Sequence, residues 1–331
     1  MKTNAGVPCF CILNNKGGVG KTTLASLSAE YASLIQNKRV LLLDWDGQMN
    51  LTKSYIGVET VPGWGRLPVP NPIVKTMALD DPDTLSIYEE RSTVTDIFQD
   101  KSVMPYPTRF YKGDPDDTDT PRIDIVAGNA MGIKLLLESS PTELRESPYK
   151  RLADVNTAQI IQCFVDFVSD PSLSEQYDLV IVDTGPSDSP LFSAALNAAT
   201  HVLCPYVPES KSVSGIEALV DAVKTAMINR VTHQYRPEQL KLIGIAPNMV
   251  DSRSADHLDC IARAMEEAGE YHLDEGLWLR RLTAYRTLTD DVERRSKPYS
   301  VFLDKPSNPA RRDAEAFFER LFSEIFEWEA A

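Results

Sequence analysis

Residues 16–23 read Lys-Gly-Gly-Val-Gly-Lys-Thr-Thr (KGGVGKTT). They follow the apolar run at residues 7–13, which has the composition of a strand buried on both faces, and they open a helical pattern at residues 22–35. Glycines here let successive backbone N–H groups turn inward around an anion, and the N-terminus of the following helix adds partial positive charge. The stretch is therefore predicted to be a phosphate-binding loop (P-loop).

This P-loop supplies both backbone donors and side-chain ligands. Lys21 is expected to reach the β- and γ-phosphates of a nucleotide, and the Thr22 hydroxyl is expected to bind Mg²⁺. The strict pattern G-x-x-x-x-G-K-[ST] requires glycine at position 15, where this chain has Asn15 followed by Lys16. A second lysine thus replaces part of the glycine framework. The loop residues predicted to surround the phosphates are Gly17, Gly18, Val19 and Gly20.

Acidic residues follow two further strand-like runs. Asp44 and Asp46 lie at the end of the run at residues 39–44, and Asp183 ends the run at residues 177–183. Ligands of open parallel sheets sit at the carboxyl ends of the strands, so these carboxylates are expected to converge on the phosphates. Asp44 and Asp183 are predicted to hold Mg²⁺ through water, and Asp46 to orient the attacking water. Trp45, between the two acids, is expected to pack beneath its own segment, and contact with a partner subunit is the alternative.

Alternation of apolar strand patterns and helical patterns predicts an α/β fold: a mostly parallel, twisted sheet with helices on both faces, as in P-loop NTPases. Strands are expected at residues 7–13, 39–44, 123–126, 177–183, 201–207 and 240–246. Helices are expected at residues 22–35, 157–168, 190–199, 213–228, 255–267 and 311–328.

The chain is interpreted as a single domain over residues 1–331 with an insertion at residues 58–121. That insertion holds nine of the 22 prolines and an acidic cluster at residues 114–119. This composition predicts a loop-rich segment with one short helix at residues 94–98. Structureless stretches of this length are uncommon in compact domains and are often functional. Residues 270–331 are expected to form a C-terminal basic segment and a final helix.

Composition excludes several classes of protein. Of the 331 residues, 43% are apolar and 25% charged, which fits a globular chain rather than a disordered one. No run approaches the ~20 apolar residues that span a bilayer. Five cysteines without CxxC spacing favour a reduced, cytoplasmic protein. The net charge of −14 opposes long-range attraction to nucleic acid, so such binding would need a local basic patch.

The motifs resemble those of the deviant Walker A ATPases, and within them most closely the ParA group that partitions plasmids and chromosomes. The resemblance rests on KGGVGKTT, on LLLDWDGQMNLT at residues 41–52, on YDLVIVDTGPSDSP at residues 177–190 and on VLCPYVPESKSVSGI at residues 202–216. It covers residues 7–56 and 123–268. The usual first-switch pattern D-x-D-P-Q-G-N is altered here, because Gly47 replaces the proline and Met49 the second glycine.

The resemblance implies roles for individual residues. Lys16 would reach across an ATP-bound homodimer to the partner's phosphates, and with Lys21 and Asp46 it would form the catalytic set. Thr23 would contact the α-phosphate, and Asn248 the adenine. The first switch would comprise Asp44, Asp46 and Gln48, and Asp183 would open the second. The implied cofactors are ATP and Mg²⁺, and the implied reaction is hydrolysis to ADP and phosphate.

The resemblance also implies partners: non-specific DNA in the ATP-bound state, with association with the nucleoid, and a ParB-like protein. Residues 280–312 contain nine basic and four acidic residues, which is a local exception to the acidic chain. The predicted DNA contacts are Arg280, Arg281, Arg286, Arg294, Arg295 and Lys297.

Two alternative functions remain open. A MinD-like membrane regulator would end in a basic amphipathic helix, whereas the polar face of the helix at 311–328 is acidic, so no stable membrane binding is expected. A P-loop ATP-dependent synthetase would need a pocket for a small-molecule acceptor. Turnover of such an acceptor would distinguish a synthetase from a switch ATPase.

Overall fold

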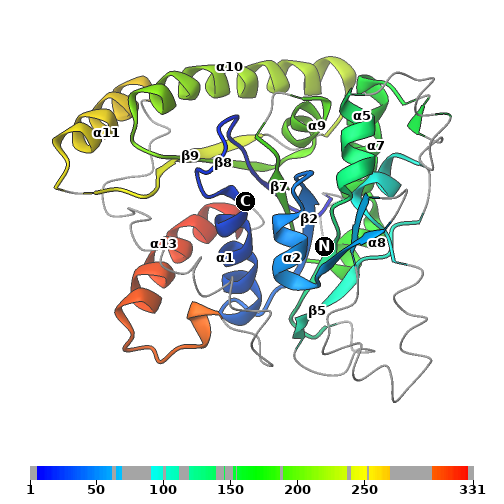
Figure 1. Cartoon of the computed structure of the whole chain (residues 1–331), viewed down its shortest axis with the longest axis horizontal. Helices are drawn as coiled ribbons and strands as arrows, with labels where there is room; N and C mark the ends of the chain where they lie inside the picture. Colours follow the sequence, from blue (N-terminus) through cyan, green and yellow to red (C-terminus); the bar gives the residue numbers. More distant parts are fainter. Residues whose placement is uncertain are drawn as a thin grey trace.

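The computed structural model describes residues 6–61, 65–68, 91–99, 102–111, 119–138, 145, 152–153, 155–186, 189–236, 240–251, 253–268 and 300–326. Its main sheet has the order β5-β6-β2-β7-β1-β8-β9 (Figure 1). All neighbouring strands are parallel except β5, which is antiparallel to β6. The predicted α/β P-loop NTPase fold is confirmed. The strands are β1 (Cys9–Ile12), β2 (Arg39–Trp45), β5 (Tyr106–Tyr111), β6 (Arg122–Val126), β7 (Leu179–Thr184), β8 (His201–Tyr206) and β9 (Lys241–Pro247).

Helices cover both faces of this sheet (Figure 1). One face packs against α1 (Lys21–Leu34), α2 (Asn50–Tyr55), η5 (Val301–Leu303) and α13 (Pro309–Phe326). The other packs against η1 (Val94–Phe98), α5 (Ala130–Glu138), α7 (Thr157–Ser169), α8 (Pro171–Gln176), α9 (Pro190–Ala198), α10 (Ser210–His233) and α11 (Ala255–Ala268).

Strand β1 shows why the sheet is buried on both sides. Cys9 and Cys11 belong to the core cluster on the face of α7 and α9, whereas Phe10 and Ile12 belong to the cluster on the face of α1 and α13. Successive side chains of a strand point to opposite faces, so a strand with helices on both sides must be apolar throughout. The continuous apolar run that identified the strand in the sequence follows from this position.

Sheet order brings the ends of three strands together. Strand β7 lies between β1 and β2, and its Asp183 is in register with Ile12 of β1 and Asp44 of β2. The predicted P-loop follows β1, the segment predicted to be the first switch begins at the end of β2, and the segment predicted to be the second switch begins at the end of β7. Segments that are far apart in the sequence therefore meet at the carboxyl ends of these three strands, as the sequence predicted.

The region at residues 58–121 contains more regular structure than expected. Strands β3 (Val58–Val61) and β4 (Gly65–Pro68) form an antiparallel hairpin, and the predicted short helix is present as the 3-10 helix η1. Strand β5 was not predicted, because Pro105 and Pro107 interrupt its apolar pattern. Proline is tolerated there because β5 is an edge strand, and its pairing with β6 shifts register between Pro107 and Tyr111.

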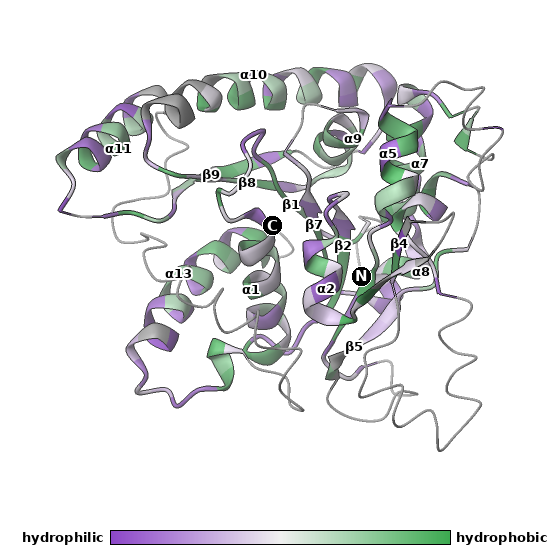
Figure 2. Cartoon of the chain, viewed as in Figure 1, coloured by the Kyte–Doolittle hydropathy of each residue, from purple (hydrophilic) through white to green (hydrophobic). Residues whose placement is uncertain are grey.

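Aromatic side chains fix the C-terminal helix to the P-loop helix. Tyr31 of α1 stacks on Phe318 and Phe322 of α13, with ring centroids 5.6 and 5.4 Å apart, and Phe302 meets Tyr31 edge-on at 5.5 Å. Figure 2 shows apolar residues on β8 and β9 and a mixture of apolar and polar residues along α13. The aromatic stripe of α13 is thus part of the protein core. Within the described residues, no helix combines the length and the apolar character required to cross a membrane.

Replacement of Phe318 tests this packing. Phe318 is completely buried, so Phe318→Ala should lower the free energy of unfolding by about 3–5 kcal/mol, through lost apolar burial and the cavity left behind. Phe326→Ala is the matched control, because Phe326 lies on the same helix but is only half-buried. Urea unfolding of both variants measures the difference. Equal losses would contradict the assignment of Phe318 to the core.

Candidate nucleotide-binding site

The P-loop has the backbone conformation that its glycines permit. Gly18 and Gly20 have φ angles of 75° and 97°, in the left-handed region that favours glycine. Gly20 caps the N-terminus of α1, and a Cβ atom added there would lie 2.3 Å from the Asn248 side-chain amide. The backbone conformation therefore favours glycine at position 20, and a larger residue would also displace the Asn248 side chain.

The Lys21 side chain folds back onto the backbone at the start of the P-loop. Its ammonium donates hydrogen bonds to the carbonyl oxygens of Asn14 and Lys16, both at 2.9 Å, and the residue is 7% exposed. Burial lowers the pKa of Lys21, and the carboxylates of Asp183 and Asp46 oppose that shift. The charge nevertheless lies at the loop, where a phosphate group would be attracted.

Asn14 is a site residue that the sequence reasoning missed. Its side-chain oxygen accepts the Lys16 backbone N–H at 2.7 Å, and its amide donates to the Pro205 carbonyl at 2.7 Å. It therefore ties the entrance of the P-loop to the end of β8. An asparagine directly after a strand was the available signal, because its side chain readily bonds to backbone two residues on.

Asp44 is fully buried and already bonded within the chain. One carboxylate oxygen accepts the Thr52 hydroxyl at 2.6 Å and the Thr52 N–H at 2.8 Å, and the other accepts the Asp46 N–H at 3.2 Å. Burial raises the pKa of Asp44 to about 6, against the lowering effect of these hydrogen bonds. Because Thr52 belongs to α2, Asp44 anchors the first switch to the helix that follows it.

Asp183 is fully buried but lacks such partners. Among the described residues, neither of its carboxylate oxygens has a hydrogen-bond partner of normal geometry, and the Thr22 hydroxyl stabilises the charged form only in part. Burial and the neighbouring charge of Asp44 raise the pKa of Asp183 well above its usual range, and Thr22 and Lys21 counteract only part of that rise. An unpaired buried carboxylate is costly, and a divalent cation beside the Thr22 hydroxyl would satisfy it. The donor set therefore fits Mg²⁺.

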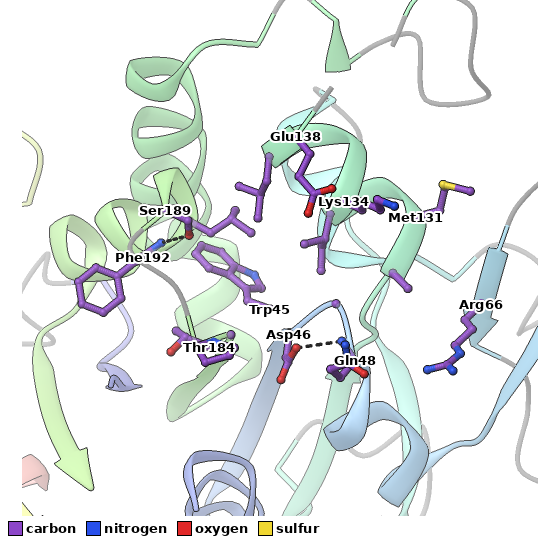
Figure 3. A pocket seen from close by; sticks show the side chains of 17 residues that line it. Trp45, Asp46, Gln48, Arg66, Met131, Lys134, Glu138, Thr184, Ser189 and Phe192 are labelled. Carbon is purple, nitrogen blue, oxygen red and sulfur yellow. Dashed lines mark hydrogen bonds between the residues drawn. The ribbon is translucent and has the colours of Figure 1, made fainter. Parts of the chain in front are cut away.

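A cleft of about 640 Å³ opens between the two switches (Figure 3). Asp46 and Gln48 line it from the first switch, and the Asp46 carboxylate accepts the Gln48 N–H at 2.9 Å. Trp45 forms part of its wall but is almost fully buried, with its ring centroid 4.2 Å from that of Phe164, so the expected packing of this side chain is present. The remaining lining residues come from both predicted switches, α9, α5 and β4: Gly47, Arg66, Ala130, Met131, Ile133, Lys134, Leu137, Glu138, Thr184, Gly185, Pro186, Ser189, Leu191 and Phe192.

Lys16 is engaged within its own chain. Its ammonium forms an ion pair of 2.5 Å with Glu209, which immediately precedes α10, and the two side chains are 36% and 57% exposed. Lys16 thus lies at the protein surface, at the start of the P-loop. A residue in this position can be reached by a second protein chain.

Asn248, at the end of β9, contacts the P-loop rather than open space. Its amide donates to the Val19 carbonyl at 2.8 Å, and its side-chain oxygen accepts the Met249 N–H at 2.8 Å. The predicted adenine contact therefore stays a prediction. Thr22 and Thr23 are half-buried in the first turn of α1. The six predicted DNA contacts lie outside the described residues.

Together, the glycine loop between β1 and α1, the lysine folded over it and the acids at the ends of β2 and β7 define a P-loop nucleotide-binding protein. Residues 10–275 match the family model described as the CobQ/CobB/MinD/ParA nucleotide binding domain. The chain belongs to this family, and its ParA-type deviant Walker A motif is thereby confirmed.

Known proteins resemble the chain over most of its length. It is 30% identical to the chromosome-partitioning ATPase Soj of Thermus thermophilus over 250 residues, which is 76% of this chain and 72% of that protein. A variant of McdA from Cyanothece in complex with ATP has a TM-score of 0.63 at 16% identity, covering 96% of this chain and 97% of that one. Cobyrinic acid a,c-diamide synthase from Mycobacterium smegmatis, with an ATP analogue and magnesium, has a TM-score of 0.51 at 21% identity, covering 88% and 98%.

Proposed function

We propose that this chain is a ParA-type switch ATPase that binds ATP, dimerises and hydrolyses the nucleotide to ADP and phosphate. The observation that carries the proposal is the placement of Lys21, Asp183 and Asp46 around a glycine loop that also bears the extra lysine, Lys16. Such a site needs no covalent intermediate, because phosphoryl transfer depends mainly on positioning and on neutralising charge.

Each residue contributes one part of this chemistry. Backbone N–H groups of residues 17–20 and the Lys21 ammonium hold the phosphates. The Asp46 carboxylate orients the water that attacks the γ-phosphate. Lys16 of one subunit adds positive charge at the partner's phosphates, where it stabilises the transition state.

Magnesium would be held by the Thr22 hydroxyl and by Asp183, and it would neutralise phosphate charge when bound. Asp44 would contribute through water, because Thr52 and the Asp46 N–H already occupy its two oxygens. This division of roles also explains why one of the two buried acids is bonded within the chain and the other is not.

The biological role that we propose is partition of a plasmid or chromosome. The Thermus thermophilus relative is named a chromosome-partitioning ATPase, and it covers three quarters of this chain. Non-specific DNA binding would use the basic residues between Arg280 and Arg312, doubled in a dimer, and a ParB-like protein would stimulate hydrolysis. Membrane attachment through α13 is not expected, because its aromatic residues pack against α1.

ATP hydrolysis measured with and without duplex DNA of arbitrary sequence tests this function. We expect slow release of phosphate that requires Mg²⁺, and a mobility shift of the DNA that appears only with ATP. The shift should weaken steeply with salt, because phosphate contacts release counterions. Absence of hydrolysis together with absence of a shift at low salt would contradict the proposal.

An ATP-dependent synthetase is the second candidate, and the cleft between the switches favours it. A cleft of about 640 Å³ is within the range of ligand pockets. The cobyrinic acid synthase likeness supports the fold alone at 21% identity. The candidates separate in one assay: a synthetase consumes ATP only with an acceptor present, whereas a switch ATPase releases free phosphate without one.

A further inference from the structure

The lysine proposed to act on the partner subunit is held by an acid of its own subunit. Lys16 Nζ lies 2.5 Å from Glu209 Oε2. Glu209 lies in the connection between β8 and α10, far from Lys16 in the sequence but next to it in space. The contact joins the P-loop to an element more than 190 residues away.

The side chain of Glu209 does not cap the helix that it precedes. Glu209 is the N-cap residue of α10, yet its side chain makes no capping hydrogen bond. Helices usually carry serine, threonine, aspartate or asparagine at this position, because those short side chains can cap the first turn. Glu209 is a longer acid than these residues, and its carboxylate reaches the P-loop and pairs with Lys16.

The rest of Lys16 is fixed, so only its side chain can change partner. Its backbone N–H is bonded to Asn14 at 2.7 Å, and its carbonyl accepts the Lys21 ammonium at 2.9 Å. Asn14 in turn is bonded to Pro205 at the end of β8, the strand that leads to Glu209. The backbone of Lys16 is thus connected through Asn14 to the strand that precedes Glu209. The side chains of Lys16 and Glu209 remain partly exposed.

We propose that Glu209 is a positioning residue that keeps Lys16 on its own subunit until the phosphates of a partner's ATP compete for it. This inference rests on the proposed function of Lys16 in the dimer. Exposed ion pairs are weak, so the contact can be exchanged for a multiply charged triphosphate without a large barrier. Glu209 thus raises the protein concentration at which the ATP-bound dimer forms.

Neutralising Glu209 tests the inference. Glu209→Gln keeps the shape of the side chain but removes its charge, so the dissociation constant of the ATP-bound dimer should fall by about three- to five-fold in sedimentation experiments. The difference in this dissociation constant between the variant and the wild type should decrease as the salt concentration rises, because salt screens exposed ion pairs. A purely structural role would not produce that salt dependence.

Glu324→Gln is the matched control. Glu324 of α13 forms an ion pair with Lys241 of β9, and their side chains are 42% and 48% exposed respectively, similar to the Lys16 pair. This variant should leave dimerisation unchanged. A Glu209→Gln dimer that is as weak as the wild type, or weaker, would overturn the inference.

A second measurement separates this inference from the proposed function. In the nucleotide-free protein, Lys16 should react several-fold faster with acetic anhydride in Glu209→Gln than in the wild type, whereas other lysines should not change. Unchanged labelling of Lys16 overturns the inference whatever the nucleotide does. If Lys16 labels faster in Glu209→Gln, as expected, but the wild type stays monomeric with ATP, the result contradicts the proposed dimer and not the inference about Glu209.

Discussion

Lys16→Ala should abolish ATP-dependent dimerisation and reduce hydrolysis by about 10²-fold or more, while the monomer still binds Mg–ATP. The reason is that a cation supplied from a partner subunit stabilises charge that develops only in the transition state, for which arginine fingers contribute about 10³–10⁵ in rate. Lys21 and the glycine loop remain intact in this variant, so nucleotide affinity should change little. Sedimentation with ATP and phosphate release are the two measurements.

Lys53→Ala provides the control for charge alone. Lys53 is an exposed lysine on α2, close in sequence to the first switch. It should hydrolyse ATP and dimerise like the wild type. An ATP-dependent dimer of Lys16→Ala with wild-type affinity would exclude a role for Lys16 across the interface.

Asp183→Asn should have opposite effects on stability and on nucleotide binding. The buried carboxylate has no hydrogen-bond partner among the described residues, so its neutral isostere should raise the free energy of unfolding of the nucleotide-free protein at pH 8 by roughly 1–3 kcal/mol. The same change removes a predicted magnesium ligand, so the Mg²⁺-dependent part of ATP affinity should fall by about 10²-fold. Chemical denaturation and calorimetry measure the two effects.

The dependence of stability on pH follows from the direction of the Asp183 shift. Its pKa is raised in the folded state, so the folded protein holds a proton at pH values where the unfolded chain has released it. The free energy of unfolding should therefore decrease as pH rises from the unfolded pKa through the folded pKa of Asp183. Asp183→Asn should flatten this decrease.

Asp221→Asn serves as the control, because Asp221 is an exposed acid on α10. It should leave both the stability profile and ATP affinity unchanged. A nucleotide-free Asp183→Asn protein that is less stable than the wild type would contradict the inference that this carboxylate is unsatisfied without a ligand.

Much of the fold was predictable because its signals are local. A strand covered by helices on both faces is apolar throughout, and a glycine loop before a helix has a distinct composition, so β1, β2, β7 and the P-loop were all predicted. The convergence of Asp44 and Asp183 followed from the rule that ligands of open parallel sheets bind at the carboxyl ends of the strands. Their direct register pairing depends on the sheet order, which the predictions left open.

What the sequence did not predict depends on tertiary context. The prolines in and next to strand β5 are typical of a loop, and the strand tolerates them only because it is the outermost strand of the sheet. Helix α2 is short, and its link to Asp44 through Thr52 joins two segments that sequence patterns treat separately. The partners of Asn14 and Glu209 lie about 190 residues away, so no local pattern could assign them.

The central claim is that this loop holds a triphosphate whose hydrolysis needs Lys16 from the other subunit. Mixing two inactive variants, Lys16→Ala and Asp46→Ala, tests it most directly. In a mixed dimer, the site on the Lys16→Ala chain keeps its own Asp46 and receives Lys16 from its partner, so the mixture should regain a substantial part of wild-type ATP hydrolysis. Activity of the mixture no higher than that of either variant alone would contradict a lysine that acts across the interface.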